Sequence, residues 1–459
     1  MADPANVFAI DDIRTVTGAA VRPLVATRAS ILEAIDKHHR IDSDAENITA
    51  EAASSFASDD ALASVREVLE DAPIVKLVNL LIGQAIADRA SDVHIEPGQH
   101  DLRVRYRVDG VLHEVMRPPK NIQSGIISRL KVMAEMNIAE RRIPQDGRVR
   151  TTIDGREIDL RVATLPTVHG EKVVMRILDK SNALLRLTDL GFLPENMARY
   201  ETSYRKAYGT ILVTGPTGSG KSTTLYATLN ILNEDSKNVI TVEDPVEYQL
   251  PGINQVQVNV KAGLSFAAAL RSILRSDPDI VLVGEIRDRE TATIAIEAAL
   301  TGHLVLTTLH TNDAATTPSR LVEMGVEPFL VGSAIDCVVA QRLARRLCDK
   351  CKEAYQPGRG DLEQMGWDFE RHGGLDRLPT MFRAVGCGAC GRTGYHGRFA
   401  VHEVMNITEE IERLIVERGH SEEIRKAAVA HGMLPLRQAG LIEVASGTTS
   451  VEEVLRVIA

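Results

Sequence analysis

The stretch ILVTGPTGSGKSTTLYATLN, residues 211–230, decides the fold of this chain. Three apolar residues lead into a glycine-rich turn, residues 215–222, and a segment with the composition of a helix follows. Such a turn faces its backbone N–H groups toward a polyphosphate at a helix N-terminus, while a lysine binds the β- and γ-phosphates and a hydroxyl binds Mg²⁺. We therefore predict a phosphate-binding loop.

The predicted nucleotide ligands belong to this turn and to the start of the helix after it. They are Gly215, Pro216, Thr217, Gly218, Ser219, Gly220, Lys221, Ser222 and Thr223. Ser222 supplies the hydroxyl for Mg²⁺. A Gly- and Ser-rich surface turn is the alternative interpretation, and the strand pattern before the turn and the helix pattern after it argue against that alternative.

The composition is that of a soluble protein with several domains. Its 459 residues are 44% hydrophobic and 25% charged, which leaves room for two to four domains. The net charge is −10, and residues 1–71, with 14 acids and 6 bases, account for −8 of it. The nearly neutral remainder and the 4% of aromatic residues predict no nucleic-acid partner. No apolar run approaches the roughly 18 residues that span a bilayer, and the first residues lack the order of a signal peptide, so we expect a cytoplasmic protein.

The chain before the nucleotide-binding part divides into three predicted pieces: a small folded piece at residues 1–40, an acidic linker at 41–70, and an α+β domain at 71–185. Residues 73–89 have apolar side chains at helical spacing. The alternating residues 102–108 run into Asp109-Gly110, a strong two-residue hairpin signal, and Ile153-Asp154-Gly155-Arg156 begins a second hairpin. Helix and hairpins together predict an antiparallel sheet with helices packed on it.

Arginines gather in the predicted strands of this domain. They are Arg103, Arg105 and Arg107, which share one strand face, and Arg148, Arg161 and Arg176 in neighbouring segments. The pattern fits a solvated strand face. It also fits a row of guanidinium groups aimed at phosphate or at the next subunit.

Residues 186–345 alternate strand and helix patterns, as expected of a mostly parallel α/β sheet. The short apolar runs at 239–242, 280–283 and 304–309 predict strands that are buried on both faces. Polar residues follow each run, and the carboxyl ends of parallel strands are where open α/β sheets bind ligands.

Carboxylates stand at these strand ends. Glu285 is the candidate that orients or deprotonates an attacking water, and Glu243 and Glu247 are candidates near the metal. Gly284 occupies the position where a common phosphate-loop ATPase places its acid. We therefore expect the metal to be held by Ser222, waters and Glu285.

A histidine and four arginines complete the candidate site. His310 is a weak candidate for sensing the γ-phosphate, because a lone histidine near a strand is usually structural. Arg271 and Arg275 lie one helical turn apart. With Arg287 and Arg320 they are candidates for an arginine supplied across a subunit interface, a device that accelerates phosphoryl transfer. Surface charge that keeps the protein soluble is the alternative.

Several motifs together resemble the type II/type IV secretion ATPase superfamily, and more closely its type II secretion ATPases and type IV pilus assembly ATPases. They are RASDVHIEP (89–97), PQDGR (144–148), the phosphate loop, VEDPVE (242–247), VGEIRD (283–288) and TGHLVLTTLHTN (301–312). The resemblance implies a homo-hexameric ATPase with a PAS-like domain before a RecA-like one. It also implies docking on the inner-membrane platform proteins of a pilus or pseudopilus machine, and hence a place at the inner face of the cytoplasmic membrane.

The resemblance also assigns roles to residues. It makes Glu285 and Lys221 catalytic, with His310 in the family's His box, and it makes Arg161 and Arg176 the arginines that reach the nucleotide from the PAS-like domain. Arg271, Arg275, Arg287 and Arg320 match family arginines at the site or at subunit contacts, and Gly284 matches the family pattern. Residues 3–40 resemble the latter half of the family's N-terminal domain, so we predict no cyclic di-GMP site, whose motif lies in the other half.

Four cysteines form two pairs, Cys348-x-x-Cys351 and Cys387-x-x-Cys390. Four thiolates suffice for a closed tetrahedral site, which predicts a structural zinc in a module at residues 346–400. Unmetallated surface thiols are the alternative. Assembly and secretion members of the resembled family share this module and retraction members lack it, so the resemblance favours extension or secretion. A C-terminal helical subdomain is expected at 401–459.

The expected function is pilus assembly driven by ATP hydrolysis, with type II secretion as the alternative within the same family. A nucleic-acid translocase is disfavoured by the neutral charge and few aromatic residues. A nucleotide-gated scaffold without turnover is disfavoured by Glu285.

Overall fold

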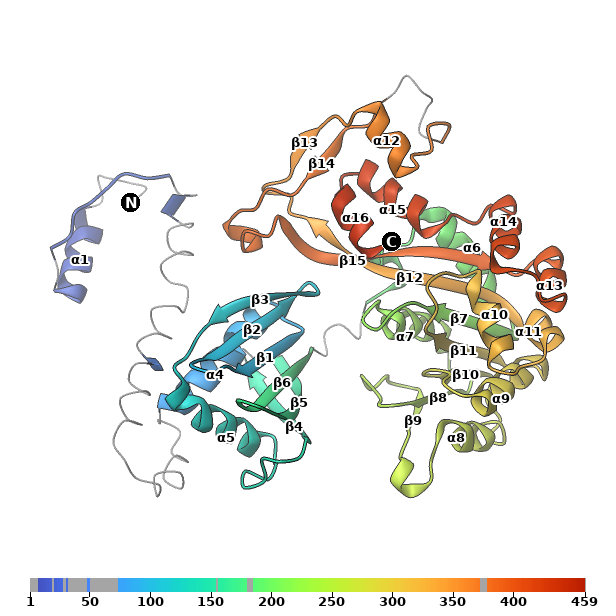
Figure 1. The fold of residues 1–459 in the computed structure, drawn as a ribbon, viewed down its shortest axis with the longest axis horizontal. Helices are drawn as coiled ribbons and strands as arrows, with labels where there is room; N and C mark the ends of the chain where they lie inside the picture. The colour runs from blue at the N-terminus through green and yellow to red at the C-terminus, as the bar shows by residue number, and fades with distance from the viewer. Residues whose placement is uncertain are drawn as a thin grey trace. The chain divides into compact units, whose positions relative to one another are not determined.

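The computed structural model describes residues 7–18, 20–27, 30–31, 48–49, 73–153, 156–179, 185–371 and 378–458. The chain divides at residues 180/181 into two units, and each is described by itself (Figure 1). Helix α1 (Val7–Thr17) belongs to the predicted N-terminal piece. The predicted acidic linker, apart from residues 48–49, lies outside the described residues, as do Asp154 and Gly155.

The first unit is built on a six-stranded antiparallel sheet in the order β3-β2-β1-β6-β5-β4. Its strands are β1 (Asp92–Pro97), β2 (Leu102–Val108), β3 (Val111–Met116), β4 (Gln145–Ile153), β5 (Arg156–Thr167) and β6 (Gly170–Asp179). Helices α4 (Pro73–Ala87) and α5 (Gln123–Met133) share a hydrophobic core with these strands. Tyr106 of β2 is buried in that core, and its hydroxyl donates to Leu81 O of α4 at 2.6 Å. The predicted α+β architecture is confirmed.

The predicted hairpins explain the order of the strands. Asp109 and Gly110 connect β2 to β3 with φ angles of 48° and 84°. Positive φ at both central positions is what a two-residue hairpin turn of type I′ requires, and Asp-Gly supplies it at low cost. The second predicted hairpin is also present, since β4 and β5 pair from Ile153 opposite Arg156 to Gln145 opposite Thr164.

A seven-stranded sheet organises the second unit, in the order β15-β12-β7-β11-β10-β8-β9. Its strands are β7 (Gly209–Thr214), β8 (Val239–Glu243), β9 (Asn254–Gln257), β10 (Ile280–Val283), β11 (Leu304–Leu309), β12 (Ile335–Leu347) and β15 (Tyr395–Asn406). All neighbours are parallel except β12 and β15. The predicted mostly parallel sheet is confirmed, and each predicted apolar run is a strand.

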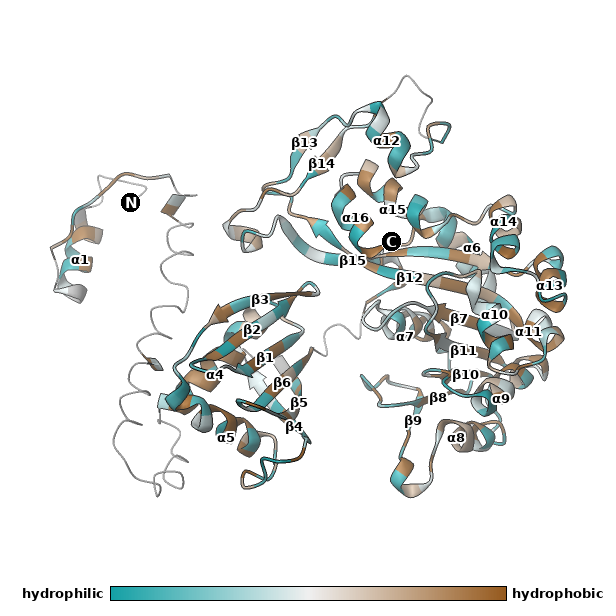
Figure 2. Cartoon of the chain, viewed as in Figure 1, coloured by the Kyte–Doolittle hydropathy of each residue, from teal (hydrophilic) through white to brown (hydrophobic). Residues whose placement is uncertain are grey.

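Helices cover both faces of this sheet, and each face has its own hydrophobic core (Figure 1). One core includes α6 (Pro194–Tyr204) and α7 (Lys221–Leu232). The other includes α8 (Phe266–Ile273), α9 (Arg289–Leu300), α10 (Thr316–Glu323), α11 (Pro328–Ala334), α13 (Glu409–Val416), α14 (Ser421–Ala430) and α15 (Leu436–Ala445). Strands covered on both sides are mostly apolar, as Figure 2 shows for β7, β10 and β11, although β7 and β11 also carry buried threonines.

Residues between β12 and β15 form a separate small layer. It contains β13 (Glu353–Tyr355), α12 (Arg359–Met365) and β14 (Met381–Arg383). Leu362, Trp367 and Met381 share a core with residues of α15 and α16 (Val451–Val457). The boundary predicted at 400/401 falls inside β15, so the C-terminal part begins in the main sheet and is helical only from α13 onward.

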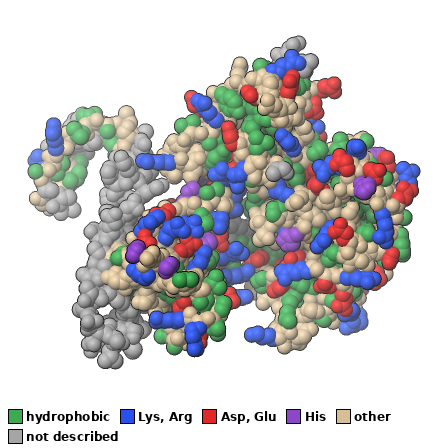
Figure 3. Space-filling model, in the orientation of Figure 1, with side chains coloured by type: hydrophobic (Ala, Val, Ile, Leu, Met, Phe, Trp, Pro, Cys, Tyr) green, Lys and Arg blue, Asp and Glu red, His purple; other side chains and the backbone are tan. Residues whose placement is uncertain are grey.

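The surface of the second unit carries charges of both signs. Figure 3 shows Lys and Arg side chains interspersed with Asp and Glu over the face that it presents. This distribution agrees with the nearly neutral composition of the chain after residue 71.

A buried ion pair in the first unit gives a stability prediction. Lys131 of α5 contacts Glu171 of β6, and their side chains are only 1% and 6% exposed. Lys131→Met leaves the Glu171 carboxylate buried without its cation, and such a loss costs roughly 3–5 kcal/mol. Urea-dependent hydrogen exchange of α5 and β6 peptides in the full chain measures the free energy of unfolding of this unit.

The double variant Lys131→Met/Glu171→Leu is the control for that experiment. It replaces both charges with apolar groups, which is often neutral, and should recover most of the lost stability. A single variant as stable as the wild type would contradict the assignment.

Candidate functional site

The phosphate loop connects the central strand β7 to α7. Gly215, Gly218 and Gly220 have φ angles of 144°, 80° and 89°, a backbone conformation that side-chain-bearing residues rarely adopt. The loop therefore needs glycine at these positions to turn sharply before the helix. Ser222 and Thr223 lie in the first turn of α7, whose N–H groups have no partner within the helix. The arrangement is suited to an anion at a helix N-terminus.

Lys221 places a cation inside this loop. Its Nζ donates to Gly215 O at 2.9 Å and to Pro216 O at 3.2 Å. Burial lowers the pKa of Lys221, whereas the nearby charge of Glu285 acts to raise it. The lysine thus contacts two loop carbonyls and lies within electrostatic range of the carboxylate that follows β10.

Three of the predicted residues meet at the ends of β10 and β11. Glu285 follows β10, and its Oε1 accepts a hydrogen bond from Arg287. Its Oε2 lies 3.5 Å from Nε2 of His310, which follows β11. Its charge also acts on Lys221. The structure therefore brings Lys221, Glu285, Arg287 and His310 to one edge of the sheet, as predicted from the strand ends.

Gly284 has a packing reason to be glycine. A Cβ added there would lie 3.3 Å from both the Cα of Glu243 and the carbonyl oxygen of Val242. A larger residue at the end of β10 would therefore require the backbone of β8 to shift by a few tenths of an ångström. The carboxylate of this strand comes one position later, at Glu285.

Glu243 has a different environment from Glu285. It is 5% exposed, and its carboxylate accepts hydrogen bonds from Thr241 Oγ1 at 2.6 Å, Gln255 Nε2 at 3.1 Å and the hydroxyl of Tyr226. Tyr226 belongs to α7, and its hydroxyl also accepts from the N–H of Glu247 at 3.3 Å. The geometry ties Glu243 and Glu247 to the helix that follows the phosphate loop. Contact of either residue with a metal stays a prediction.

Gln341 of β12 is a site residue that the sequence interpretation missed. Its Nε2 donates to Ser219 O at 2.7 Å, and its Oε1 accepts from Thr224 Oγ1 at 2.7 Å. The side chain is buried, so these two bonds fix the loop and the first turns of α7 against the neighbouring strand. One signal was present in the sequence, because Gln341 is a polar residue after the apolar run 337–340.

Three of the predicted arginines lie elsewhere on the second unit. Arg271 of α8 pairs with Glu290 of α9, Arg275 donates to Arg271 O at 2.7 Å, and Arg320 of α10 lies 3.2 Å from Glu323. These partners belong to the helices themselves and not to the phosphate loop. The role of these three arginines at a subunit interface stays a prediction.

Arg161 and Arg176 lie on the sheet of the first unit. The strand register places five residues in one row across it, in the order Arg107, Asp92, Arg176, Arg161 and Arg148. Asp92 Oδ1 lies 3.0 Å from Arg176 Nε, and its Oδ2 lies 3.6 Å from Arg107 Nε. One carboxylate among four arginines leaves this row strongly positive.

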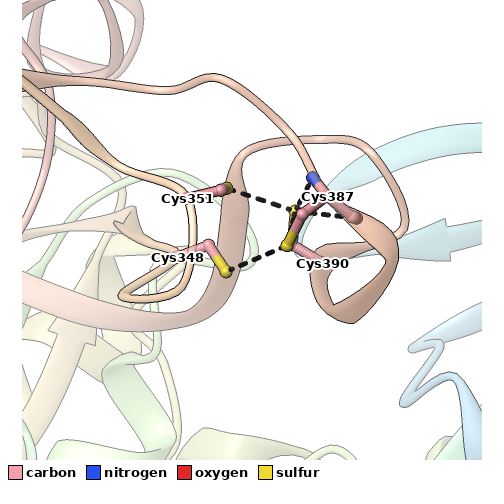
Figure 4. Close-up of side chains that lie close together, drawn as sticks. All are labelled: Cys348, Cys351, Cys387 and Cys390. Atoms are coloured by element: carbon pink, nitrogen blue, oxygen red, sulfur yellow. Dashed lines mark hydrogen bonds between the residues drawn. The ribbon is translucent and has the colours of Figure 1, made fainter. Parts of the chain in front are cut away.

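The four paired cysteines converge on one point (Figure 4). Their sulfur atoms all lie within 4.8 Å of one another, and the Cys348–Cys387, Cys351–Cys390 and Cys387–Cys390 sulfur pairs are 3.9, 3.9 and 3.8 Å apart. Four thiolates at about 2.3 Å from a zinc ion would be roughly 3.8 Å apart at the corners of a tetrahedron. The donor set and its spacing therefore fit zinc.

Backbone groups also prepare this cluster for thiolates. The N–H groups of Cys387 and Gly394 donate to the sulfur of Cys390, each at 3.2 Å. Burial raises the pKa of the Cys390 thiol, but these hydrogen bonds and those from the thiols of Cys351 and Cys387 together lower the pKa to about 7. A thiolate is the form that binds a metal.

The family model described as type II/IV secretion system protein matches residues 67–456. The chain belongs to the type II/IV secretion system protein family. A second model, the MshEN domain, matches residues 1–45.

Several members of this family are similar to this chain over most of its length. The type IV pilus assembly ATPase PilB of Myxococcus xanthus is 47% identical over 462 aligned residues, which cover 99% of this chain and 81% of the relative. The type II secretion system protein HxcR of Pseudomonas aeruginosa is 51% identical over 388 residues, or 84% of this chain and 78% of the relative. The pilus assembly ATPase PilB of Thermus thermophilus is 46% identical, and this chain spans 51% of its length.

Solved structures share the fold at lower identity. The ATPase DotB of Legionella pneumophila aligns with a TM-score of 0.61 and 21% identity, over 83% of this chain and 95% of its own. The pilus retraction motor PilT with bound ADP aligns with a TM-score of 0.54 and 24% identity, over 82% and 95% of the two chains. The family's α/β ATPase fold is therefore that of this chain.

The contacts of Gln341 lead to a prediction about nucleotide affinity. Gln341→Leu keeps a similar volume but leaves the Ser219 carbonyl and the Thr224 hydroxyl buried without these partners. Such a loss costs about 1–3 kcal/mol, so we expect affinity for ADP to fall roughly tenfold. Titration with a fluorescent ADP analogue measures it.

Gln438→Leu is the matched control. Gln438 lies on α15, where its Nε2 donates to Gly366 O at 2.8 Å, and this bond does not involve the phosphate loop. Equal affinities of the two variants would show that Gln341 does not position the loop.

Proposed function

We propose that this chain is a homo-hexameric motor that hydrolyses ATP and thereby drives the assembly of pilin subunits into a type IV pilus. The chain is an ATP-hydrolysing enzyme by its family. The observation that carries the proposal is the meeting of Glu285, His310 and Arg287 beside Lys221 in a chain so similar to a pilus assembly ATPase. ATP is the substrate of the reaction, and pilin is the protein whose assembly the reaction drives.

Each residue at the sheet edge has a chemical task in this proposal. The loop N–H groups and Lys221 bind the phosphates, and Ser222 offers a hydroxyl to Mg²⁺, which neutralises charge on the phosphates when bound. Glu285 holds the attacking water and accepts its proton. Arg287 and His310 keep the Glu285 carboxylate oriented.

Type II protein secretion is the second candidate function. The observation that favours it is the 51% identity to the secretion protein HxcR, together with 48% identity over 419 residues to the type II secretion system ATPase E of Vibrio cholerae. In that case the assembled subunits are pseudopilins, and the same ATPase site is used.

In a hexamer, residues of the first unit and residues of neighbouring subunits would complete the nucleotide site. We propose that Arg161 and Arg176, from the positive row of the PAS-like first unit, reach the phosphates when the units close. Arg271, Arg275 and Arg320 are proposed to act at subunit contacts, where a guanidinium from a neighbour stabilises charge in phosphoryl transfer. Arg176, Arg271 and Arg320 are exposed, with 59%, 52% and 54% of their side chains accessible.

The proposed partners are the inner-membrane platform proteins of the pilus or secretion machine. The chain would reach the inner face of the cytoplasmic membrane through them. Among the described residues, no helix is both long enough and apolar enough to cross a membrane.

The cysteine cluster is proposed to hold a structural zinc. Cys348 and Cys351 follow β12, and Cys387 and Cys390 precede β15. All four ligand positions of a tetrahedral ion would be filled by thiolates, so no position would be open to a substrate or water.

Glu285→Gln tests the hydrolytic role. The substitution keeps the shape of the side chain but removes the base, so we expect ATP turnover to fall roughly a hundredfold or more with little change in ATP binding. Phosphate release by the purified chain measures turnover, and Lys221→Ala should be inactive as well. Glu297→Gln, on an exposed position of α9, is the matched control and should keep wild-type turnover.

Glu285→Gln also distinguishes pilus assembly from type II secretion in cells. Loss of surface pili in a strain that carries only Glu285→Gln supports pilus assembly. Intact pili with a loss of secreted proteins supports type II secretion instead. Wild-type turnover by Glu285→Gln would contradict the proposed mechanism.

Zinc content tests the cysteine cluster. We expect one zinc ion per purified chain, measured by elemental analysis, and its loss in Cys387→Ser together with a lower unfolding temperature of the second unit. Cys337→Ala is the control, because Cys337 is buried in β12 and lies outside the cluster. Purified wild-type protein without metal would contradict the zinc assignment.

A further inference from the structure

Arg342, the residue after Gln341 on β12, has an unusual set of partners. Its Nη1 donates to Gln341 O at 3.1 Å, and its Nη2 donates to Asn312 O at 2.7 Å. The side-chain oxygen of Asn312 lies 3.5 Å from Nη2. All of these acceptors are neutral. No carboxylate of the described residues lies within 4.0 Å of this guanidinium.

Other arginines near this part of the sheet do have carboxylate partners. Arg345, three residues farther along β12, lies 2.6 Å from the buried carboxylate of Glu453. Arg425 of α14 lies 2.7 Å from Asp313, the residue directly after Asn312. Asp313 is therefore already paired with Arg425.

Burial makes the missing counterion significant. Arg342 is partly buried, and burial lowers its pKa, although Asp313 and Glu403 at longer range act to raise it. A partly buried cation without a paired anion is unfavourable. The position of Arg342 is therefore explained best by an anion that the chain itself does not supply.

The phosphate loop is the nearest place for such an anion. The carbonyl oxygen of Gln341, which accepts from Arg342, would lie only 2.5 Å from a Cβ added at Gly215, so the loop packs directly against it. The charge of Arg342 also acts on Lys221, where it adds to the larger effect of burial in lowering the pKa. An anion bound at Lys221 would therefore lie within the electrostatic range of Arg342.

We propose that Arg342 is a second anion-binding cation of the nucleotide site, acting with Lys221 on the phosphate chain of a bound nucleoside triphosphate. The inference rests on the proposed function and adds a residue that it does not use. Arg342 approaches the loop from β12, whereas Arg287, Glu285 and His310 approach from β10 and β11. Because its guanidinium also holds Asn312 O, it links the bound phosphates to the segment that carries His310.

Equilibrium titration of the full chain with a fluorescent, non-hydrolysable ATP analogue and Mg²⁺ tests this assignment. Arg342→Gln removes the charge, and we expect the dissociation constant to rise on the order of ten- to a hundredfold, as for the loss of a hydrogen bond to a charged group. Arg342→Lys retains the charge without the forked contacts, and it should recover at least half of that loss on a logarithmic scale. Arg346→Gln is the matched control, because Arg346 of the same strand lies over the Phe399 ring at 5.0 Å, and it should stay within twofold of wild type.

The outcomes distinguish an effect of the Arg342 charge from an effect of its hydrogen bonds to the Gln341 and Asn312 carbonyls. Wild-type affinity in Arg342→Gln overturns the proposal. Equal weakening in Arg342→Lys and Arg342→Gln also overturns it, because the lost carbonyl contacts would then explain the effect. The wild type and Lys221→Ala test the nucleotide site itself: the wild type should bind the analogue, and Lys221→Ala should bind it much more weakly. Failure of the wild type to bind the analogue overturns the proposed function. Equal binding by the wild type and Arg342→Gln overturns only the role of Arg342.

Discussion

The amide side chain of Gln341 is the contact on which the nucleotide site depends. It spans the gap between β12 and the phosphate loop with one donated and one accepted hydrogen bond, both in a buried position. Glycines at 215 and 220 let the loop approach this strand, since a Cβ at either would lie within 3 Å of Gln341 atoms. Lys221 donates to the Gly215 and Pro216 carbonyls, and the Ser219 carbonyl is satisfied from the neighbouring strand by Gln341.

Much of the fold was predictable because its signals are local. Asp109-Gly110 fixes a hairpin through the φ angles of two residues, and the apolar runs at β8, β10 and β11 show burial on both faces. The cluster at the sheet edge was predictable for a related reason. Parallel strands end at the same edge, so Glu285 and His310 had to be near Lys221 once their strands were identified.

The residues that were not predictable depend on contacts between distant parts of the chain. Gln341 is 122 positions from Ser219, and no period or motif in the sequence connects them. The hydrogen bond that Tyr226 of α7 donates to Glu243, 17 positions later, is likewise a contact that no local pattern indicates. The predicted boundary at 400/401 falls inside β15, because the pairing of β15 with β12 joins segments that are far apart in the sequence.

Strand β12 has a further consequence for how the motor moves. The middle of the strand is bonded to the phosphate loop through Gln341, Arg345 near its C-terminal end pairs with Glu453, and that end leads directly into Cys348. An extended strand rises about 3.3 Å per residue and resists stretching. The segment from Gln341 to Cys348, some 20 Å long by roughly this rise, therefore connects the residue that holds the phosphate loop to the cysteine cluster. This connection would couple ATP hydrolysis at the phosphate loop to the region of the cysteine cluster without requiring the sheet to bend.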